Sequence, residues 1–567
     1  MSRPSPLHLP EARPARGILL CGLLLAGCSG GEPEPVREGQ PWFEEVAASR
    51  GLDFQHTTGH EERCLFPEII AGGGALVDLD ADGDLDAYLV QSGHLTPDAP
   101  ESPPNQLFLN DGSGAFTDFT EESGSGDRGY GMGVVCGDAD GDGDVELYVL
   151  NLEENVLFDN QGGARFRDGT AASGLADPSW SVSGSFFDAE NDGDLDLFVV
   201  NYIAWSLSSE IECSRAFNKS PDYCSPKQYQ APAPDTFYRN DGNGVFTDVS
   251  AAAGLRTSFG NGLGLVCTDF DDDGWTDIFV ANDGTPNQLW RNRGDGTFLD
   301  EADKRGFAFD QHGFAKAGMG VAAGDVDADG DEDVIVVNQG GETDSFYRND
   351  GGAFLFDSTL QFGLGAATRP FTRFGVALLD FDNDGHLDLY EANGRVERAQ
   401  QPGGSDPYAE ENVLMRGVSD QHFVEVSPRG GTARPLSATS RGAAFGDIDG
   451  DGGLDILVIN RDGPAHLLRN VIANRGEWLR VNALDGNGSA AVGALVTVVA
   501  SDRTISRVVR SGYSYAAASD LGVHFGLGDA ATVEEIRVRW PDGSRESFGP
   551  SDTGTSVDCR RGAGKVL

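Results

Sequence analysis

The stretch Asp78 to Asp86 reads Asp-Leu-Asp-Ala-Asp-Gly-Asp-Leu-Asp, and this nine-residue pattern decides the fold because it returns six more times along the chain. Positions 1, 3, 5 and 9 of the pattern carry a carboxylate in every copy, and position 6 is always glycine. The copies, called loops one to seven below, begin at Asp78, Asp138, Asp188, Asp269, Asp325, Asp380 and Asp447.

Alternating carboxylates around a glycine provide the ligands of a calcium loop. A hard cation takes about 6 to 8 oxygen ligands at roughly 2.3–2.6 Å, and glycine permits the sharp turn that brings them together. Position 7 is aspartate in four copies but Trp275, His386 and Gly453 in the others, so we expect its backbone carbonyl to be the ligand. The sequence therefore predicts calcium at about seven sites.

Each loop contributes five predicted ligands. They are Asp78, Asp80, Asp82, Asp84 and Asp86; Asp138, Asp140, Asp142, Asp144 and Glu146; Asp188, Glu190, Asp192, Asp194 and Asp196; Asp269, Asp271, Asp273, Trp275 and Asp277; Asp325, Asp327, Asp329, Asp331 and Asp333; Asp380, Asp382, Asp384, His386 and Asp388; and Asp447, Asp449, Asp451, Gly453 and Asp455.

The residues that flank the loops predict strands on both sides. An EF-hand would place a bidentate glutamate at position 12, between helices. Position 12 is leucine or valine here, with Glu391 as the exception. Each loop follows a glycine-rich apolar segment and runs into a segment such as Leu-Asp-Leu-Phe-Val-Val-Asn at Leu195. A third segment, an Asn-Asp-Gly turn and a short fourth segment complete the unit.

Four strands in each unit, with loop starts 50 to 81 residues apart, indicate the blades of a propeller. We predict an all-β fold: a seven-bladed β-propeller with calcium loops over residues 42–470, followed by a small β-sandwich-like domain over 471–567. Phe43-Glu44-Glu45-Val46 matches a fourth strand that precedes any first strand, so it should complete the seventh blade. Its rival for that edge is Trp478-Leu479-Arg480-Val481.

The first residues predict an export signal. Arg13 and Arg16 precede an apolar run too short to be a stable membrane span, which ends in Leu-Ala-Gly-Cys28. This ending resembles the bacterial lipobox, which implies a signal peptide over 1–27, lipidation of Cys28 and a tether over 28–41. We therefore expect an exported protein, lipid-anchored at the cell envelope at the periplasmic face of the outer membrane or at the cell surface, with no other membrane contact.

The net charge of −50 makes nucleic acid a poor partner for this surface, so we expect none. The predicted loop positions account for 32 of the 91 acidic residues. Residues 471–567 are neutral overall, with 11 basic and 11 acidic residues, so the charge lies upstream of a domain boundary.

Export implies an oxidising compartment in which cysteines can pair. Cys213 and Cys224 lie in one long insertion, residues 205–234, and we predict a disulfide between them. Cys136 and Cys267 occupy the same repeat position and should be buried strand residues. The sequence does not decide whether Cys64 and Cys559 pair.

The repeats resemble FG-GAP/VCBS repeats, those of the integrin α-chain propeller, through their Gly-x-Gly, Asp-x-Asp-x-Asp-Gly and Asn-Asp-Gly-x-Gly-x-Phe elements. The last domain resembles the ASPIC/UnbV domain through residues 493–498, 524–528 and 538–543. Together they resemble the cartilage acidic protein family in a lipid-anchored bacterial version. This resemblance implies an architecture rather than a reaction.

Three functions remain open at this point. The first is a module that binds a protein or a glycan, with the insertion and its Tyr223 and Tyr229 as the contact loop. The second is a polysaccharide lyase or hydrolase in the central funnel, and the third is an assembly or maturation factor for exported proteins. His56 and His60 have a spacing compatible with a transition-metal site on a helix, but Gly59 between them favours a loop.

Overall fold

The computed structural model describes residues 39–567 except 97–98, 216–218, 353, 401, 419–421 and 502. The expected signal peptide, the expected lipidation site Cys28 and the start of the expected tether lie outside the described residues. Among the residues that are described, none of the helices is long and apolar enough to cross a membrane.

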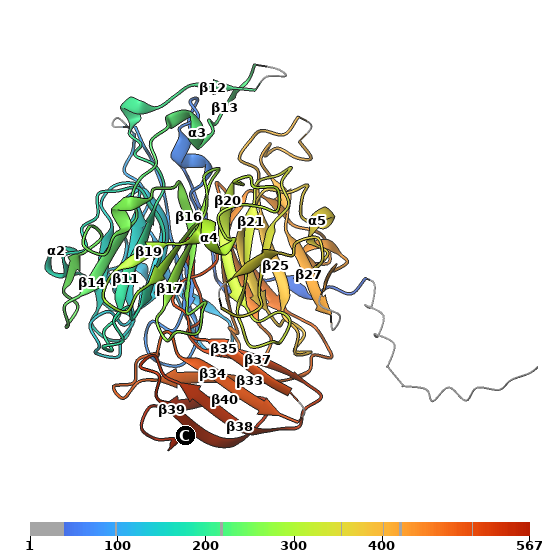
Figure 1. Cartoon of the computed structure of the whole chain (residues 1–567). Coiled ribbons are helices and arrows are strands. Elements are labelled where there is room, and N and C mark those ends of the chain that lie inside the picture. Colours follow the sequence, from blue (N-terminus) through green and yellow to red (C-terminus); the bar gives the residue numbers. More distant parts are fainter. Residues whose placement is uncertain are drawn as a thin grey trace, which may run out of the picture. The chain divides into compact units, whose positions relative to one another are not determined.

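Seven sheets with the same strand order form the body of the described chain (Figure 1). In each sheet the first strand pairs antiparallel with the second, the second with the third and the third with the fourth. The calcium-type loop joins the first strand to the second, and position 9 of the loop is the first residue of the second strand. This is the four-stranded blade that the repeat predicts.

The strand bounds follow the repeat closely. The first strands are β2 (Gly74–Val77), β6 (Gly131–Gly137), β10 (Ser181–Phe187), β16 (Gly262–Thr268), β20 (Gly318–Gly324), β24 (Arg373–Leu379) and β30 (Ser440–Gly446). The second strands are β3 (Asp86–Leu89), β7 (Glu146–Asn151), β11 (Asp196–Asn201), β17 (Asp277–Asn282), β21 (Asp333–Asn338), β25 (Asp388–Asn393) and β31 (Asp455–Asn460). The third strands are β4 (Gln106–Asn110), β8 (Val156–Asn160), β14 (Thr236–Asn240), β18 (Gln288–Asn292), β22 (Ser345–Asn349), β27 (Val413–Val418) and β32 (His466–Asn470). The fourth strands are β5 (Phe116–Asp118), β9 (Phe166–Asp168), β15 (Phe246–Asp248), β19 (Phe298–Asp300), β23 (Leu355–Asp357), β28 (His422–Glu425) and β1 (Phe43–Glu45).

The ring closes between its two ends. The first strands contact one another in the order β2, β6, β10, β16, β20, β24, β30 and back to β2. Strand β1 pairs with β32 through Phe43 opposite Asn470, so the N-terminal segment is the outer strand of the seventh blade, the position predicted from the sequence. The rival segment, Trp478 to Val481, pairs instead with two strands of the C-terminal domain.

Glycine lines the centre of the ring because adjacent first strands approach closely there. A Cβ atom on Gly320 would lie 1.9 Å from the carbonyl oxygen of Phe374 in the next blade. A side chain at this position would push two blades apart, which explains the glycine in the repeat.

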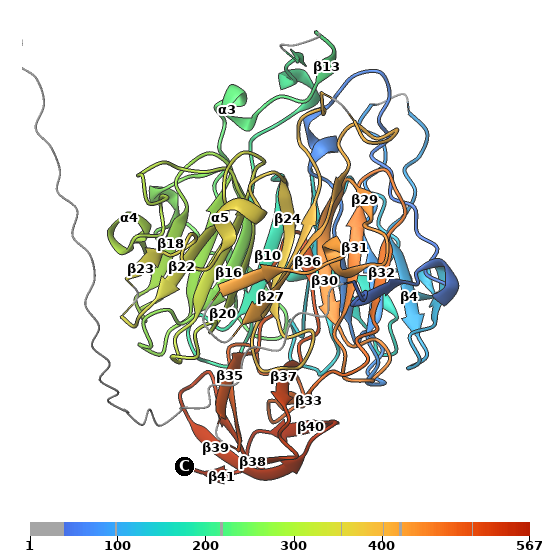
Figure 2. The same cartoon turned by 90° about the vertical axis from the view of Figure 1, so that its right-hand side faces the viewer.

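Short helices and the insertion lie between strands of the propeller. One-turn helices follow outer strands at α1 (Thr120–Ser123), α2 (Thr170–Ser173), α4 (Ala302–Arg305) and α5 (Leu364–Ala367). The insertion contains β12 (Cys213–Ser214), β13 (Pro221–Asp222) and α3 (Pro226–Tyr229), and β26 (Glu410–Glu411) pairs with β29 (Ser437–Ala438) nearby in the sequence. Figures 1 and 2 show the insertion at one end of the propeller and the C-terminal strands at the other.

The C-terminal domain is built from two sheets around its own core. One sheet has the order β37 (Val523–Gly528), β33 (Glu477–Leu484), β40 (Thr555–Arg560). The other has the order β35 (Arg503–Val508), β34 (Leu495–Ala500), β38 (Thr532–Arg539), β39 (Arg545–Asp552), β41 (Lys565–Val566). Apolar side chains on alternate positions of β33, β34 and β38 meet in a cluster that includes Trp540 and Phe525.

One segment of this domain, Ser511–Ser519, enters the centre of the propeller, and we call it the central segment. Its short strand β36 (Ala517–Ala518) pairs in parallel with β2 of the first blade. Ser514 exchanges two backbone hydrogen bonds with Val321 of the fifth blade, at 2.7 and 3.0 Å. The hydroxyl of Ser511 accepts a hydrogen bond from the Phe186 amide of the third blade. The channel is therefore filled by the chain itself, a feature that the sequence did not predict.

Candidate metal centres

The predicted ligands converge within individual loops. In each of several loops, carboxylate oxygens from three residues lie within 4.8 Å of one another. These trios are Asp78, Asp80 and Asp86; Asp138, Asp140 and Glu146; Asp269, Asp271 and Asp273; Asp325, Asp327 and Asp329; and Asp380, Asp382 and Asp388. Such spacing lets one cation contact all three oxygens, so the donor set fits calcium.

The carboxylate at position 9 also joins the loop to the third strand through hydrogen bonds. Asp86 accepts hydrogen bonds from the amides of Leu79, at 3.0 Å, and Asn110, at 2.9 Å, which lie in the loop and in the third strand. Asp455 does the same with Ile448 and Asn470 in the seventh blade. Burial raises the pKa of Asp86 to about 7 despite these two hydrogen bonds. The carboxylate at position 9 therefore fixes the loop to its blade whether or not it also binds a metal ion.

Backbone amides shape the rest of each loop. The position 1 carboxylate of Asp78 accepts a hydrogen bond from the Gly83 amide at 3.0 Å, and the position 5 carboxylate of Asp82 accepts one from Asp84. Position 6 is strained for any residue but glycine, with φ of 99° at Gly83. Position 4 also has positive φ, 62° at Ala81, and the sequence offers mainly Gly, Asn or Ala there.

Position 3 points to a missing partner. The Oδ2 atoms of Asp271, Asp382 and Asp449 each form an ion pair with an arginine. The Oδ1 atoms of the same three residues are buried and have no hydrogen-bond partner in the described part of the chain. The side chains of Asp271 and Asp449 are only 10% and 9% exposed. An ionised buried oxygen without a partner is costly, and a cation in the loop would satisfy it.

Adjacent loops are joined by an asparagine that the sequence analysis treated only as a turn residue. The amide of Asn292, at the end of β18, donates to the carbonyl of Ala189 in loop three at 2.9 Å and to Thr276 in its own loop. Equivalent bonds from third strand to the preceding loop are made by Asn110, Asn160, Asn240, Asn349 and Asn470. In the sixth blade Gly417 takes this place.

The C-terminal domain covers part of the face that carries the loops. Asn487 donates to the carbonyl of Gly141 in loop two at 2.9 Å. Arg539 contacts Asp272 in loop four at 2.6 Å, and Arg503 donates to the carbonyl of Asp384 in loop six at 2.6 Å. The opposite face of the propeller therefore offers the freer surface for a ligand.

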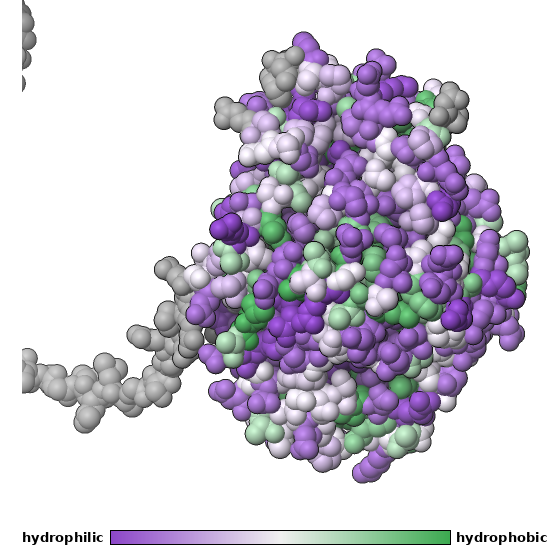
Figure 3. Space-filling view, turned by 180° about the vertical axis from the view of Figure 1, so that it is seen from behind, coloured by the Kyte–Doolittle hydropathy of each residue, from purple (hydrophilic) through white to green (hydrophobic). Residues whose placement is uncertain are grey.

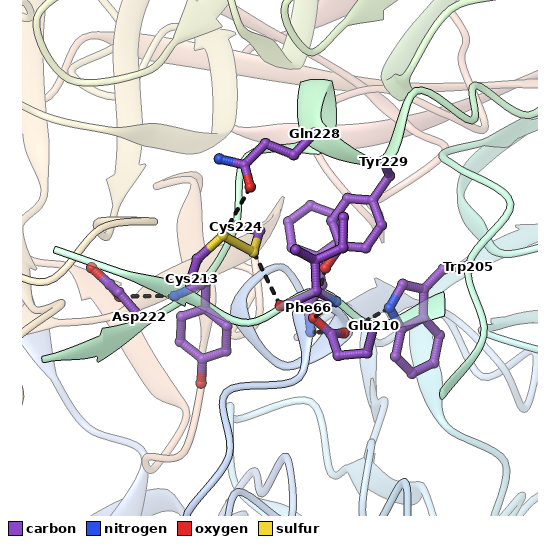
Figure 4. Close-up of a disulfide and its surroundings, with 10 residues drawn as sticks. Phe66, Trp205, Glu210, Cys213, Asp222, Cys224, Gln228 and Tyr229 are labelled. Atoms are coloured by element: carbon purple, nitrogen blue, oxygen red, sulfur yellow. Dashed lines mark hydrogen bonds between the residues drawn. A yellow bond between two sulfur atoms is a disulfide. The ribbon is translucent and has the colours of Figure 1, made fainter. Parts of the chain in front are cut away.

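The insertion on that opposite face is cross-linked and anchored (Figure 4). A disulfide joins Cys213 and Cys224, the pair expected from the sequence, while Cys64, Cys136, Cys267 and Cys559 are free thiols. Glu210 accepts hydrogen bonds from the Trp205 indole and the Tyr229 hydroxyl, both at 2.7 Å, and from the Phe66 amide at 3.0 Å. These bonds tie both ends of the insertion to the segment that precedes the first blade.

The two tyrosines expected to face a ligand are turned inward instead. The Tyr223 ring is buried and its hydroxyl donates to Glu68 at 2.8 Å. The Tyr229 ring stacks on Phe66 with centroids 5.0 Å apart. Both rings anchor the insertion through these contacts, although Tyr229 is only half-buried. Most exposed side chains of the insertion are polar, such as Ser208, Glu212 and Lys219.

Histidine, tyrosine and arginine side chains do gather at this mouth of the propeller, but they bind one another. His60 contacts Glu68 at 2.6 Å, and the Arg461 guanidinium lies over the rings of Tyr223 and Tyr408 at 5.4 and 5.0 Å. His56 turns away to Ser92, at 3.1 Å. His56 and His60 therefore do not form one metal site, as their loop setting indicated.

Comparison with known proteins matches both parts of the chain. The model of the FG-GAP-like repeat matches residues 78–149, 140–199, 269–336 and 325–391, and the ASPIC and UnbV model matches residues 485–566. The chain is similar to cartilage acidic protein 1 of Xenopus tropicalis, with 31% identity over 309 residues, and of Homo sapiens, with 30% identity over 313 residues. Each match covers 53% of this chain, and the chain spans less than half, 44%, of the length of these relatives.

Two solved structures are similar at low identity. An Agrocybe aegerita lectin that recognises non-reducing terminal N-acetylglucosamine has 16% identity and a TM-score of 0.36, covering 70% of this chain and 89% of its own. A rhamnogalacturonan lyase of Bacillus licheniformis has 14% identity and a TM-score of 0.38, covering 76% of each chain.

Proposed function

We propose that this chain, an FG-GAP-repeat propeller with an ASPIC and UnbV domain and a relative of cartilage acidic protein 1, is an exported, calcium-stabilised module that binds a protein or a glycan. Its architecture is that of a propeller binding or adhesion module. The calcium, the ligand and the membrane anchor at Cys28 are the proposed parts.

The observation that carries the calcium proposal is the buried, unpartnered Oδ1 atom at position 3 of loops four, six and seven. It lies among converging carboxylates in loops four and six, where a hydrogen-bond donor from the protein would ordinarily be expected. Calcium would be held by the carboxylates of positions 1, 3, 5 and 9 and by the backbone carbonyl of position 7, and it would supply charge neutralisation rather than a reaction step.

The size of the effect suits a structural role. A site held tenfold above its Kd adds about 1.4 kcal/mol to stability, so seven independent sites would add about 10 kcal/mol. That is comparable with the whole free energy of unfolding of an ordinary domain. Modules outside the cell often bind calcium at about 0.1–1 mM, so we expect these sites to fill only after export.

The face that carries the insertion is the proposed ligand surface. The described part of the insertion is anchored by the Cys213–Cys224 disulfide and by Glu210, and most of its exposed side chains are polar. In the side view of Figure 3, hydrophilic residues predominate at the upper end of the molecule, which carries the insertion. An anchored, polar loop suits recognition of a glycan or of a polar protein surface.

An active site in the central funnel receives less support. The central segment fills that space, with Tyr515 fully buried, and the histidine, tyrosine and arginine groups at the mouth are engaged with Glu68, Asp222 and Asp462. Sustained turnover of a polysaccharide by the purified chain would reverse this preference.

Calcium content and ligand binding test the two halves of the proposal separately. Equilibrium dialysis of the full chain against calcium should give about seven bound ions, and bound ions near zero would refute the calcium half. A glycan panel and a panel of envelope proteins should show binding that is lost in the triple variant Ser208→Ala, Glu212→Ala, Lys219→Ala. Binding that survives this variant would refute the assignment of the insertion.

A further inference from the structure

The residue immediately before the third-strand asparagine, or before Gly417 in the sixth blade, differs among the blades in a way that matches the loops. Strand by strand this residue is Leu109, Asp159, Arg239, Arg291, Arg348, Arg416 and Arg469. Where this residue is an arginine, the carboxylates that it contacts differ from blade to blade.

Three of these arginines each form ion pairs with two predicted ligands, an arrangement that we call the arginine clasp. Arg291 contacts Asp271 at 2.8 Å and Asp273 at 2.7 Å, both through Oδ2. The same bidentate arrangement joins Arg416 to Asp382 and Asp384, at 2.8 and 2.8 Å, and Arg469 to Asp449 and Asp451, at 2.5 and 2.9 Å. In loops four, six and seven the arginine thus holds positions 3 and 5 by their outer oxygens.

The same three loops lack a carboxylate at position 7. They carry Trp275, His386 and Gly453 there, whereas the other four carry Asp84, Asp144, Asp194 and Asp331. The arginines of blades three and five form ion pairs with hairpin-turn residues: Arg239 pairs with Asp241, and Arg348 pairs with Asp350. Loss of the fifth carboxylate and gain of the arginine clasp therefore occur together.

The two features change the charge of the loop in the same direction. Loop one presents five carboxylates, a formal charge of −5. At its predicted ligand positions loop four presents only four carboxylates, and the guanidinium groups of Arg291 and Arg305 both contact Asp271, so the charge at these positions is less negative. The remaining aspartate of the loop, Asp272, is paired with Arg539. A less negative loop attracts a divalent cation less strongly, and its carboxylates already have a cationic partner in the calcium-free protein.

We infer that the seven loops form two classes of calcium site: a tight class of loops one, two, three and five, and a weak class of loops four, six and seven, in which the arginine is a positioning residue that takes over part of the role of the ion. This inference rests on the proposed calcium function. The number of carboxylates sets calcium affinity in other loops, which gives the direction of the effect.

Titration calorimetry of the full chain with calcium tests the inference. Two phases are expected, about four tight sites and about three weak ones, with Kd values that differ at least about tenfold. The double variant Arg291→Leu, Trp275→Asp copies the residues of loop one into loop four and should move one site to the tight phase. Arg239→Leu is the matched control, because this arginine pairs with Asp241 of the turn and its removal should leave the ratio unchanged.

The reverse exchange guards against a variant that fails to fold. Leu109→Arg with Asp84→Gly gives loop one the residues of loop seven, and it should move one site from the tight to the weak phase. Seven equivalent sites in the natural chain, or an unchanged ratio in both double variants, would overturn the two classes while leaving the calcium proposal intact. Absence of any calcium binding would overturn the proposed function itself.

Discussion

The hydroxyl of Tyr515 donates a 2.7 Å hydrogen bond to the carbonyl oxygen of Ile70, which lies 445 residues earlier in the chain. The Tyr515 ring is fully buried against Phe374, with centroids 4.9 Å apart. The C-terminal domain thus contributes one of the largest buried side chains at the centre of the propeller. The two parts of the chain share a core, so they should unfold together.

Truncation of this side chain should destabilise the whole chain. Tyr515→Phe removes only the hydrogen bond and should lower the free energy of unfolding by about 1 kcal/mol. Tyr515→Ala also leaves a cavity and should cost about 3–5 kcal/mol. Urea denaturation followed by fluorescence measures both. A Tyr515→Ala protein as stable as the natural one would show that the central segment does not contribute to the core.

The asparagine links between blades make a second prediction. Asn292 is fully buried and its amide group is bonded to two carbonyls, so Asn292→Ala leaves them unpaired. We expect a loss of about 2–4 kcal/mol in the free energy of unfolding. The neighbouring exposed Arg293→Ala is the control and should change it by less than about 0.5 kcal/mol. Equal effects of the two variants would argue against a bridging role.

The loop carboxylates predict an unusual dependence of stability on pH. Burial raises the pKa of Asp78 to about 6, of Asp86 to about 7 and of Asp333 to about 8, all above the value of about 3.9 for an unfolded aspartate. In calcium-free buffer the folded protein takes up protons that the unfolded chain does not, so stability should rise as the pH falls from about 8 to 5.

Protons and calcium compete for the same oxygens, so the gain in stability from calcium should shrink over this pH range. Urea denaturation at pH 5.5, 6.5 and 7.5, with and without 5 mM calcium (about ten times the expected Kd), measures both trends. A calcium effect independent of pH would mean that these carboxylates are not the ligands.

The disulfide predicts local rather than global protection. Cys213 and Cys224 are separated by 11 residues, and Glu210 holds the same insertion to Phe66. The double variant Cys213→Ser, Cys224→Ser should make the insertion more susceptible to proteases, by a local loss of about 2–3 kcal/mol, while the melting temperature of the propeller changes little. Limited proteolysis with mass analysis locates the cuts. Cuts spread through the blades would contradict a local role.

Much of the propeller follows from the sequence because its determinants are local and repeated. Asp86 ends a loop and opens a strand in the same way as its six counterparts, so loop and strand positions could be aligned without a structure. The outer strand at Phe43 was also predictable, since the repeat left one fourth strand to be supplied from the N-terminal side.

The features that sequence reasoning missed depend on contacts between distant residues. The central segment is short, consists mainly of serine, alanine and tyrosine, and matches no repeat, and its bond from Tyr515 to Ile70 spans most of the chain. Tyr223 faces inward because Glu68, 155 residues away, is there to accept its hydrogen bond. The link from Asn292 to Ala189 could have been suspected from the recurring asparagine, but its partner in the preceding blade could not be identified.

Thermal unfolding of the full chain in calcium and in chelator tests the central claim most directly. If calcium neutralises the seven loops, the melting temperature should fall by at least about 10 °C when calcium is chelated, and magnesium should not restore it. An unchanged melting temperature, with no calcium retained after dialysis, would mean that these loops are acidic turns whose backbone bonds suffice, and it would contradict the account.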